Sequence, residues 1–127
     1  FTGFVSYAEL PRFLKVADIA VNTLEPTLVA NVAFPNKVLQ YMAAGLPVVS
    51  TKLDGLEQTF GNRAGITWAS DSRAVIQAAT RLAQQPAAEI RNAVKLQLDA
   101  VSQIFDVQAA VNNFEAALFR LSKGGSK

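Results

Sequence analysis

The segment from Phe34 to Ser50 constrains the fold of this chain more than any other, because a helix, a stop and a buried strand follow one another in it. Pro35 suits the first position of a helix, where its missing N–H group is not needed. Four apolar residues recur at the spacing of one buried helix face: Val38, Leu39, Met42 and Ala43. Gly45 suits the left-handed backbone that ends a helix, and Pro47 can open the strand Val48-Val49 without breaking its ladder. The segment predicts a helix packed on a buried strand.

The opposite face of this helix is polar and carries a positive charge near its start. Asn36, Lys37 and Gln40 lie there, and Lys37 and Gln40 are neighbours because they are three residues apart. A helix that begins after a loop presents free N–H groups and a partial positive charge at that end. With a lysine in the first turn, this helix start is a candidate phosphate site. The alternative interpretation is an ordinary solvated lysine.

Strand and helix patterns alternate along the rest of the chain, which predicts an α/β fold, a parallel sheet with helical crossovers. Further buried strands are expected at Phe1–Val5, Ile19–Val21 and Gly65–Ala69. Ligands of such sheets bind beyond the carboxyl ends of the strands. The loops expected at Asn22–Phe34 and Thr51–Gly55 lie at that edge, together with the helix start at Pro35.

Two short helices are expected in the first half of the chain. Ser6 and Glu9 have the spacing of a capping box, and Pro11 either bends the helix that follows or shifts its start. The buried face of that helix, which ends near Asp18, is expected to consist of Tyr7, Leu10, Phe13, Leu14 and Ala17. A turn at Asp54-Gly55 then precedes a short helix at Leu56–Phe60.

Three longer helices are expected after the last strand. Asp71 caps one that ends before Pro86 and whose apolar positions are Val75, Ile76, Ala79 and Leu82. The next carries a stripe of Ile90, Val94, Leu98, Val101 and Phe105. The last, capped by Asp106, repeats that spacing with Val107, Val111, Phe114, Leu118 and Leu121. Both stripes predict core positions, so the domain is expected to cover residues 1–122, with a frayed polar tail at 123–127.

Composition narrows the class of protein. The chain has 127 residues, of which 50% are hydrophobic and 17% charged, so we expect one globular domain. The net charge of +2 is spread without a basic cluster, which argues against nucleic-acid binding. The chain contains no cysteine and no histidine, which excludes disulfides, Cys or His metal sites and His-dependent catalysis. No apolar segment is long enough to span a membrane, and we expect a cytoplasmic protein, free or at the inner face of the membrane.

The segment from Pro35 to Val49 resembles the nucleotide-sugar site of the group 1 glycosyltransferases, retaining enzymes with the GT-B fold. That family has a Pro-x-Lys-x-x-Glu-Tyr-Met-Ala-x-Gly-x-Pro-Val-Val run, which this chain matches except for Gln40 in place of the glutamate. Phe1–Val5 and Ala17–Val21 also resemble family segments in the same order. The resemblance covers about Phe1 to Glu57. It implies a Rossmann-like C-terminal half of a GT-B enzyme, truncated at its N-terminus.

The resemblance also implies a donor site at the carboxyl edge of the sheet. It assigns the diphosphate to Asn36, Lys37 and Val38, and the ribose to Gln40. Further candidate donor contacts are Asn22, Thr23, Glu25, Thr51, Gly55 and Glu57. An acidic residue that many relatives carry is replaced by Val32. The resemblance assigns no catalytic residue and no metal. It assigns no cofactor either, because the nucleotide-sugar is a substrate.

The activity that the resemblance implies is sugar transfer from a nucleotide-sugar to an acceptor hydroxyl with retention. The acceptor site belongs to an N-terminal domain that this chain lacks, so the chain alone is expected to be inactive. The alternative is a non-catalytic Rossmann-like binding or assembly module, in which a second copy covers the open sheet edge by domain swapping. A GT-B-fold epimerase ranks lower because such enzymes use histidine, and a phosphate-receiver domain would need an acidic pair at its first strand end.

Overall fold

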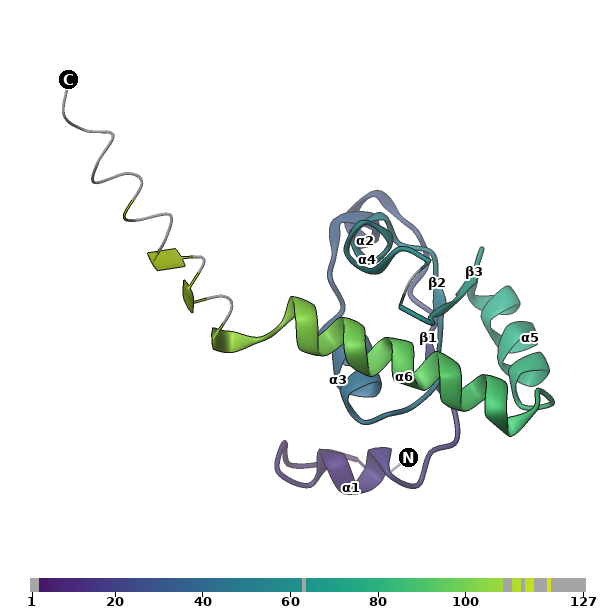
Figure 1. Cartoon of the computed structure of the whole chain (residues 1–127). Helices are drawn as coiled ribbons and strands as arrows, with labels where there is room; N and C mark the ends of the chain where they lie inside the picture. Colours follow the sequence, from purple (N-terminus) through teal and green to yellow (C-terminus); the bar gives the residue numbers. More distant parts are fainter. Residues whose placement is uncertain (1–2, 63, 109–110, 113, 116–118, 120–127) are drawn as a thin grey trace.

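The computed structural model describes residues 3–62, 64–108, 111–112, 114–115 and 119 (Figure 1). Within them, β1 (Ala20–Asn22), β2 (Val48–Thr51) and β3 (Thr67–Ala69) form a parallel sheet in the order β1-β2-β3. Ala20 lies opposite Val48, and Val49 lies opposite Thr67. These strands confirm the predicted α/β fold, and their bounds differ from the predicted ones by no more than two residues.

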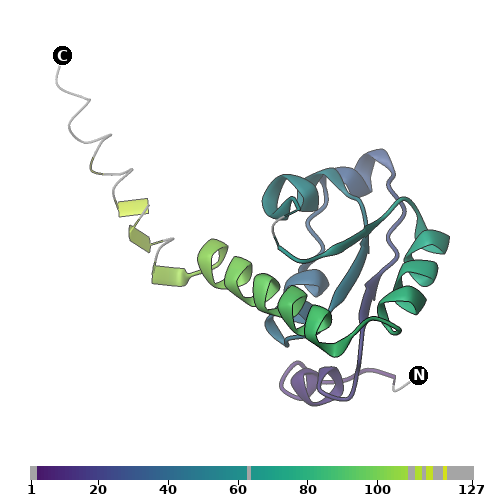
Figure 2. The same cartoon turned by 45° about the vertical axis from the view of Figure 1, so that its right-hand side comes forward.

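Six helices with assigned bounds surround this sheet in the described residues. They are α1 (Leu10–Leu14), α2 (Leu28–Val32), α3 (Asn36–Ala43), α4 (Asp54–Phe60), α5 (Ser72–Leu82) and α6 (Ala87–Ile104). Figures 1 and 2 show α5 on one side of the strands and α2, α3 and α4 on the other. Helix α6 crosses in front of α3 and packs on it.

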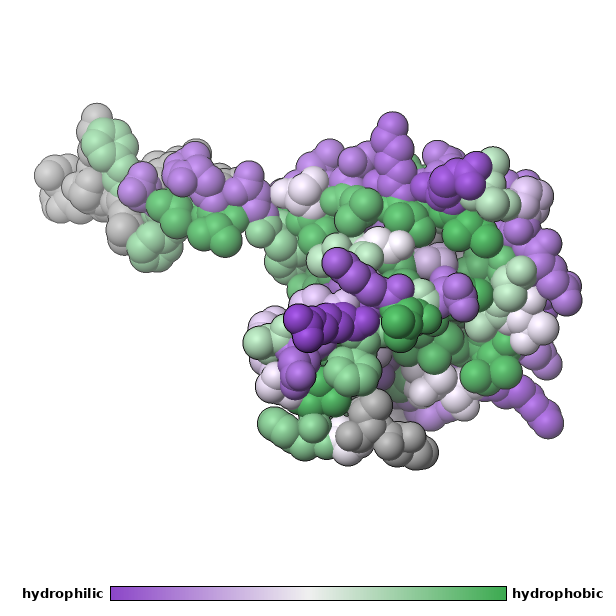
Figure 3. Space-filling model, turned by 90° about the horizontal axis from the view of Figure 1, so that it is seen from below, coloured by the Kyte–Doolittle hydropathy of each residue, from purple (hydrophilic) through white to green (hydrophobic). Residues whose placement is uncertain are grey.

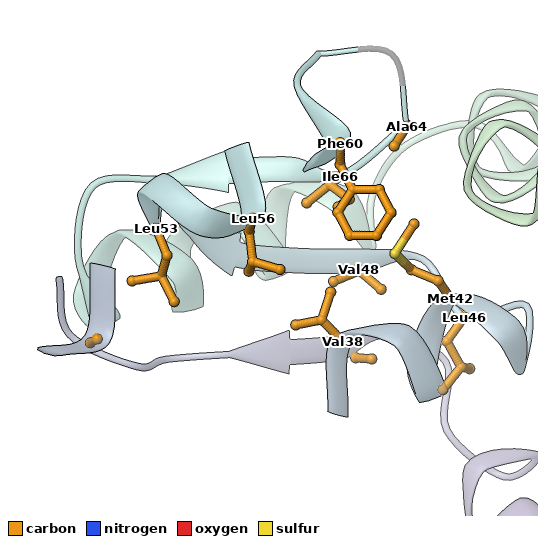
Figure 4. Packing of buried hydrophobic residues seen from close by; sticks show 11 residues of the cluster. Val38, Met42, Leu46, Val48, Leu53, Leu56, Phe60, Ala64 and Ile66 are labelled. Atoms are coloured by element: carbon orange, nitrogen blue, oxygen red, sulfur yellow. The ribbon is translucent and has the colours of Figure 1, made fainter. Parts of the chain in front are cut away.

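Two hydrophobic cores fill the two sides of the sheet. The consecutive residues Val48 and Val49 are both fully buried and point to opposite faces, as alternation along a strand requires. Val48 packs with side chains of α2, α3 and α4, including Val38, Leu56 and Phe60 (Figure 4). Val49 packs on the other face with α5, through Val75, Ala78 and Leu82. The sheet is therefore covered on both faces, as in doubly wound folds.

The predicted helix, stop and strand at the centre of the chain are confirmed. Helix α3 begins at Asn36, directly after Pro35, and ends in a Schellman motif. Gly45 has a φ of 74°, its N–H donates to the Met42 carbonyl at 3.0 Å, and the Leu46 N–H donates to the Tyr41 carbonyl at 3.1 Å. This turn delivers the chain directly into β2. Of the predicted buried residues of α3, Val38 and Met42 are buried, whereas Ala43 is exposed.

The start of the chain differs from the prediction. Residues 3–5 form no strand and Phe4 is fully exposed, while Phe1 and Thr2 lie outside the described residues. A strand needs a hydrogen-bonding neighbour, and in the described sheet β1 pairs only with β2. Helix α1 has five residues with none fully buried, and of its predicted core face Leu14 packs against the core whereas Tyr7, Phe13 and Ala17 are exposed. Pro11 does shift its start, because it occupies the first turn.

Two further corrections concern α2 and α4. The segment 22–34, expected as a loop, contains α2, whose first turn is capped because the Thr27 hydroxyl accepts from the Ala30 N–H at 3.2 Å. A threonine at the N-cap is a local sequence signal for the start of a helix. Helix α4 begins at Asp54 rather than at Leu56, so the expected turn at Asp54-Gly55 is its first turn.

The apolar stripes on the later helices predicted the core only in part. On α5, Ile76 is 57% exposed and Ala78 is buried instead. On α6, Ile90 and Val101 pack on the cores, but Leu98 is 41% exposed and Gln97 is fully buried. The Gln97 Nε2 donates to the Gly65 carbonyl at 2.9 Å, while its Oε1 has no donor among the described residues.

The stripe expected after Asp106 does not form core in the described residues. Val107, Val111 and Phe114 are exposed, and Leu118 and Leu121 lie outside the described residues. Phe105 does contribute to packing, because its ring lies 5.8 Å from that of Phe34 and 6.2 Å from that of Phe60, centroid to centroid. This aromatic cluster joins the ends of α4 and α6 to the start of α3.

Gly45 and Gly65 allow a matched test of how α6 is docked. Both have positive φ, 74° and 65°, but a Cβ on Gly65 would lie 2.3 Å from the Ala93 carbonyl oxygen of α6, whereas one on Gly45 would meet only Val94 at 3.9 Å. We expect Gly45→Ala to reduce the free energy of unfolding by about 1 kcal/mol. Gly65→Ala should reduce it by about 3 kcal/mol, because the backbone of α6 must also move. Urea denaturation measures both, and equal losses would contradict the close approach.

Candidate functional site

The carboxyl edge of the sheet gathers polar residues from three segments. Asn22 ends β1, Thr51 ends β2, and the Thr51 hydroxyl donates to the Leu24 carbonyl in the loop after β1. The same loop reaches the start of α5, where the Ser72 N–H donates to Glu25 Oε1 at 3.2 Å. The structure therefore brings the predicted site residues Asn22, Glu25 and Thr51 to one edge. The fourth residue in this group, Thr23, is exposed there.

A buried hydrogen-bonded chain lies at the centre of this edge. Asn22 Nδ2 donates to Ser50 Oγ at 2.9 Å, and Ser50 Oγ donates to the Thr51 carbonyl at 2.9 Å. Asn22, Ser50 and Thr51 are all fully buried. Asn22 Oδ1 has no donor among the described residues, and neither has Asn31 Oδ1 on α2. Asn31 did not figure among the sequence predictions, although the loop expected at Asn22–Phe34, which contains it, was placed at this edge.

The start of α3 lies at the same edge, since a crossover helix runs antiparallel to the strands that it joins. Asn36 and Lys37 are exposed, and their backbone N–H groups, in the first turn, have no acceptor within the helix. The Val38 N–H is already used, because it donates to the Pro35 carbonyl at 2.9 Å, and the Val38 side chain is fully buried. Two of the three predicted phosphate contacts are thus accessible to a ligand in this structure.

Gln40 lies one turn further along α3 and is half-buried against α1. It lines a cavity of about 230 Å³ whose other walls are mostly apolar and come from Tyr7, Leu10, Pro11, Leu14, Ala43 and Ala44. Figure 3 shows the molecule from this side, with hydrophobic side chains exposed between hydrophilic ones. Lys37 therefore lies at the helix start, and Gln40 lies on the side of the helix that faces α1.

The remaining predicted contacts lie on α4 and are engaged within the protein. Glu57 Oε1 forms an ion pair with Lys52 Nζ at 2.7 Å, between half-exposed side chains. Gly55 packs closely against α2, since a Cβ there would lie 3.3 Å from the Ala33 carbonyl oxygen and 3.4 Å from that of Asn31. Gly55 thus allows α4 to approach α2 at the edge of the sheet.

Neither a metal cluster nor a spanning helix is found in the part of the chain that the structure describes. No group of three or more His, Cys, Asp or Glu side chains there could hold a metal ion. None of the helices in that part combines the length and the apolar character needed to cross a membrane. The chemistry available at the edge consists of amides, hydroxyls, backbone N–H groups, the Lys37 ammonium and the carboxylates of Glu25 and Asp71.

Comparisons with known proteins identify the family and the fold. The family profile described as "Glycosyl transferases group 1" matches residues 1–85. Among solved structures, sucrose-phosphate synthase from Thermosynechococcus elongatus is similar with a TM-score of 0.72 and 22% sequence identity. The similarity covers 98% of this chain and 30% of that protein, so the chain spans less than a third of its length. A search of curated protein sequences finds no match.

The Asp71 carboxylate, at the start of α5, has a lowered pKa. Asp71 accepts from the Ala74 N–H at 2.8 Å and from the Ser70 hydroxyl at 2.9 Å. These two bonds, of which the Ala74 bond has the larger effect, hold the pKa of Asp71 below the ordinary value of 3.8. Because the folded pKa is the lower one, the carboxylate stabilises the fold above pH 3.8 and loses this effect as the pH falls through its folded pKa.

We therefore expect Asp71→Ala to lower the Tm at neutral pH, because α5 loses its cap. The difference in Tm between the native chain and this variant should narrow as the pH falls below 3.8. Asp71→Asn is the control, because an amide caps a helix without titrating. Thermal unfolding between pH 2 and pH 7 provides the measurement, and parallel pH profiles for the native chain and Asp71→Ala would contradict the assignment.

Proposed function

This chain belongs to the group 1 glycosyl transferases, and on that premise we propose that it forms the donor-binding part of a retaining enzyme. In this proposal a sugar passes from a nucleotide-sugar to an acceptor hydroxyl. The observation that carries it is the segment 35–49, which folds into α3, the Gly45 stop and β2, with Lys37 exposed at the helix start. That helix start lies at the edge where parallel α/β sheets bind ligands.

The groups at this helix start suit a diphosphate. The N–H groups of Asn36 and Lys37 point out of the first turn, and the Lys37 ammonium adds a full positive charge beside them. When the glycosidic bond breaks, negative charge develops on the departing phosphate. Donors that are already in place stabilise this charge without reorganisation, which is the main way in which such a site lowers the barrier.

In our proposal the chain supplies the site for the sugar donor but not the site for the acceptor. It spans 30% of the structurally similar synthase, so the acceptor would bind to a further domain of the complete protein. The partners proposed are therefore the nucleotide-sugar and that domain, with no cofactor. We expect no sugar transfer by this chain alone.

Lys37→Ala tests the phosphate contact. We expect the variant to bind nucleoside diphosphates more weakly by about 1.5–3 kcal/mol, because one charge-assisted contact is lost, and to bind nucleosides unchanged. Calorimetric titration of ADP, GDP and UDP against their nucleosides measures the difference. Lys95→Ala on α6 is the matched control, because that lysine is also exposed on a helix but lies outside the candidate site. Equal losses for nucleosides and diphosphates would refute the contact.

Gln40→Glu tests the proposed ribose contact. A carboxylate accepts from two vicinal hydroxyls more strongly than an amide, so we expect nucleotide-sugars to bind more tightly by about 1 kcal/mol. A 2′,3′-dideoxy analogue should gain nothing from the same substitution. If neither ligand responds in the titration, Gln40 is a wall of the α1 cavity only, and the binding or assembly module becomes the better description.

A further inference from the structure

Three phenylalanine rings from distant parts of the chain pack together beside the start of α3. The ring of Phe34 lies 5.9 Å from that of Phe60, the last residue of α4, centroid to centroid. It lies 5.8 Å from the ring of Phe105, which directly follows α6. The rings of Phe60 and Phe105 are 6.2 Å apart. These distances are typical of favourable aromatic pairs, so the Phe34 ring is held by two partners that also contact each other.

The start of α3 has no side-chain cap. Helices α2 and α5 are capped by Thr27 and Asp71, whose side chains accept from backbone N–H groups of the first turn. Pro35 occupies the equivalent position of α3 and makes no such bond. Where an apolar residue precedes the cap position, its packing fixes the angle at which the chain enters the helix. Phe34 is that residue here, and it packs against the larger core.

The backbone between Phe34 and α3 is stiff, so the position of the ring is passed on to the helix. A proline fixes its own φ angle and restricts the residue before it to extended conformations. Pro35 is also tied to the first turn, because its carbonyl accepts from the Val38 N–H at 2.9 Å. The free N–H groups of Asn36 and Lys37 lie between these two fixed points. Their placement therefore depends on where the Phe34 ring is held.

Phe105 brings α6 into this arrangement. Its N–H donates to the Val101 carbonyl at 2.9 Å, which ties it to the last turn of α6, and α6 packs on α3. The family profile ends at residue 85, so Phe105 belongs to a part of the chain that the profile does not match. Its side chain is 42% exposed, whereas that of Phe60 is 5% exposed. Phe105 can thus be truncated with little loss of core, which makes its contact with Phe34 testable.

We propose that Phe105 is a positioning residue for the donor diphosphate. Through the Phe34 ring it holds the first turn of α3 where the N–H groups of Asn36 and Lys37 bind phosphate. This inference rests on the proposed function. A hydrogen bond weakens steeply as its angle departs from linearity, so a helix start that shifts loses part of every bond to the anion. Without Phe105, the Phe34 ring keeps one partner in the cluster instead of two.

Phe105→Ala removes the ring, and Leu98→Ala is the matched control. Leu98 is 41% exposed on the same helix and has no part in the aromatic cluster. We expect Phe105→Ala to weaken the binding of UDP, GDP and ADP about three- to tenfold, the range of one aromatic pair, and to leave the binding of their nucleosides unchanged. Leu98→Ala should bind both kinds of ligand as the native chain does. Phe105→Tyr keeps the ring and should retain the native affinities. Calorimetric titration provides the measurement.

The relaxation of backbone amides, measured by NMR without ligand, tests the positioning separately. We expect lower order parameters at residues 36–38 in Phe105→Ala than in the native chain, and native values in Leu98→Ala.

A double variant tests whether Phe105 acts through the start of α3. When Phe105→Ala is combined with Lys37→Ala, the two losses of diphosphate affinity should be less than additive, because both substitutions affect the same first turn. Fully additive losses would show that Phe105 acts elsewhere and would overturn the positioning role.

The other outcomes separate this inference from the proposed function. Native order parameters or native diphosphate affinity in Phe105→Ala overturns the positioning role while the diphosphate site stands. An equal loss for nucleosides, or the same loss in Leu98→Ala, also overturns it, because either result indicates a general loss of stability. So does a loss in Phe105→Tyr as large as that in Phe105→Ala. If the native chain binds no nucleoside diphosphate, the proposed function is wrong and the positioning role with it.

Discussion

The parallel pairing of β1 with β2 is the constraint on which the rest of this structure depends. Parallel neighbours cannot be joined by a tight turn, so the chain between them must return across one face of the sheet. Helix α3 makes this return, and the left-handed turn at Gly45 directs it into β2. One consequence is that the first turn of α3 must lie where the strands end. The position of Lys37 thus follows from the way in which two strands of a parallel sheet are connected.

The sequence predicted this central unit well because every local signal in it agrees. Pro35, the apolar spacing of α3, Gly45 and Pro47 each favour the same helix, stop and strand. The cap of α5 at Asp71 is equally local and was equally predictable. The predictions that depended on a distant partner failed. Phe4 suits a buried strand, but no neighbouring strand covers it in the described residues. Gln97 is polar yet buried, at a place where the distant Gly65 carbonyl accepts from its Nε2.

The candidate site was predictable to the same extent and for the same reason. The edge itself follows from the fold, and with it the placement of Asn22, Glu25 and Thr51. The contacts that each side chain makes do not follow from the fold, because they depend on the neighbours that packing brings to it. Glu57 is paired with Lys52, Gln40 lines a cavity against α1, and the Val38 N–H is used within the helix. Asn31 escaped prediction because only the fold shows that α2 lies over the sheet.

Unpaired polar groups of two kinds lie at the carboxyl edge of the sheet. A stable core satisfies its buried polar groups, since each one left unpaired costs free energy that packing must offset. At the start of α3 the unpaired groups are donors in contact with solvent, where water satisfies them without cost. At the end of β1 the unpaired group is a buried acceptor, Asn22 Oδ1, which has no donor among the described residues. Gln97 Oε1 on α6 is a third buried acceptor without a donor among the described residues, so the packing of this fold leaves such atoms away from the edge as well as at it.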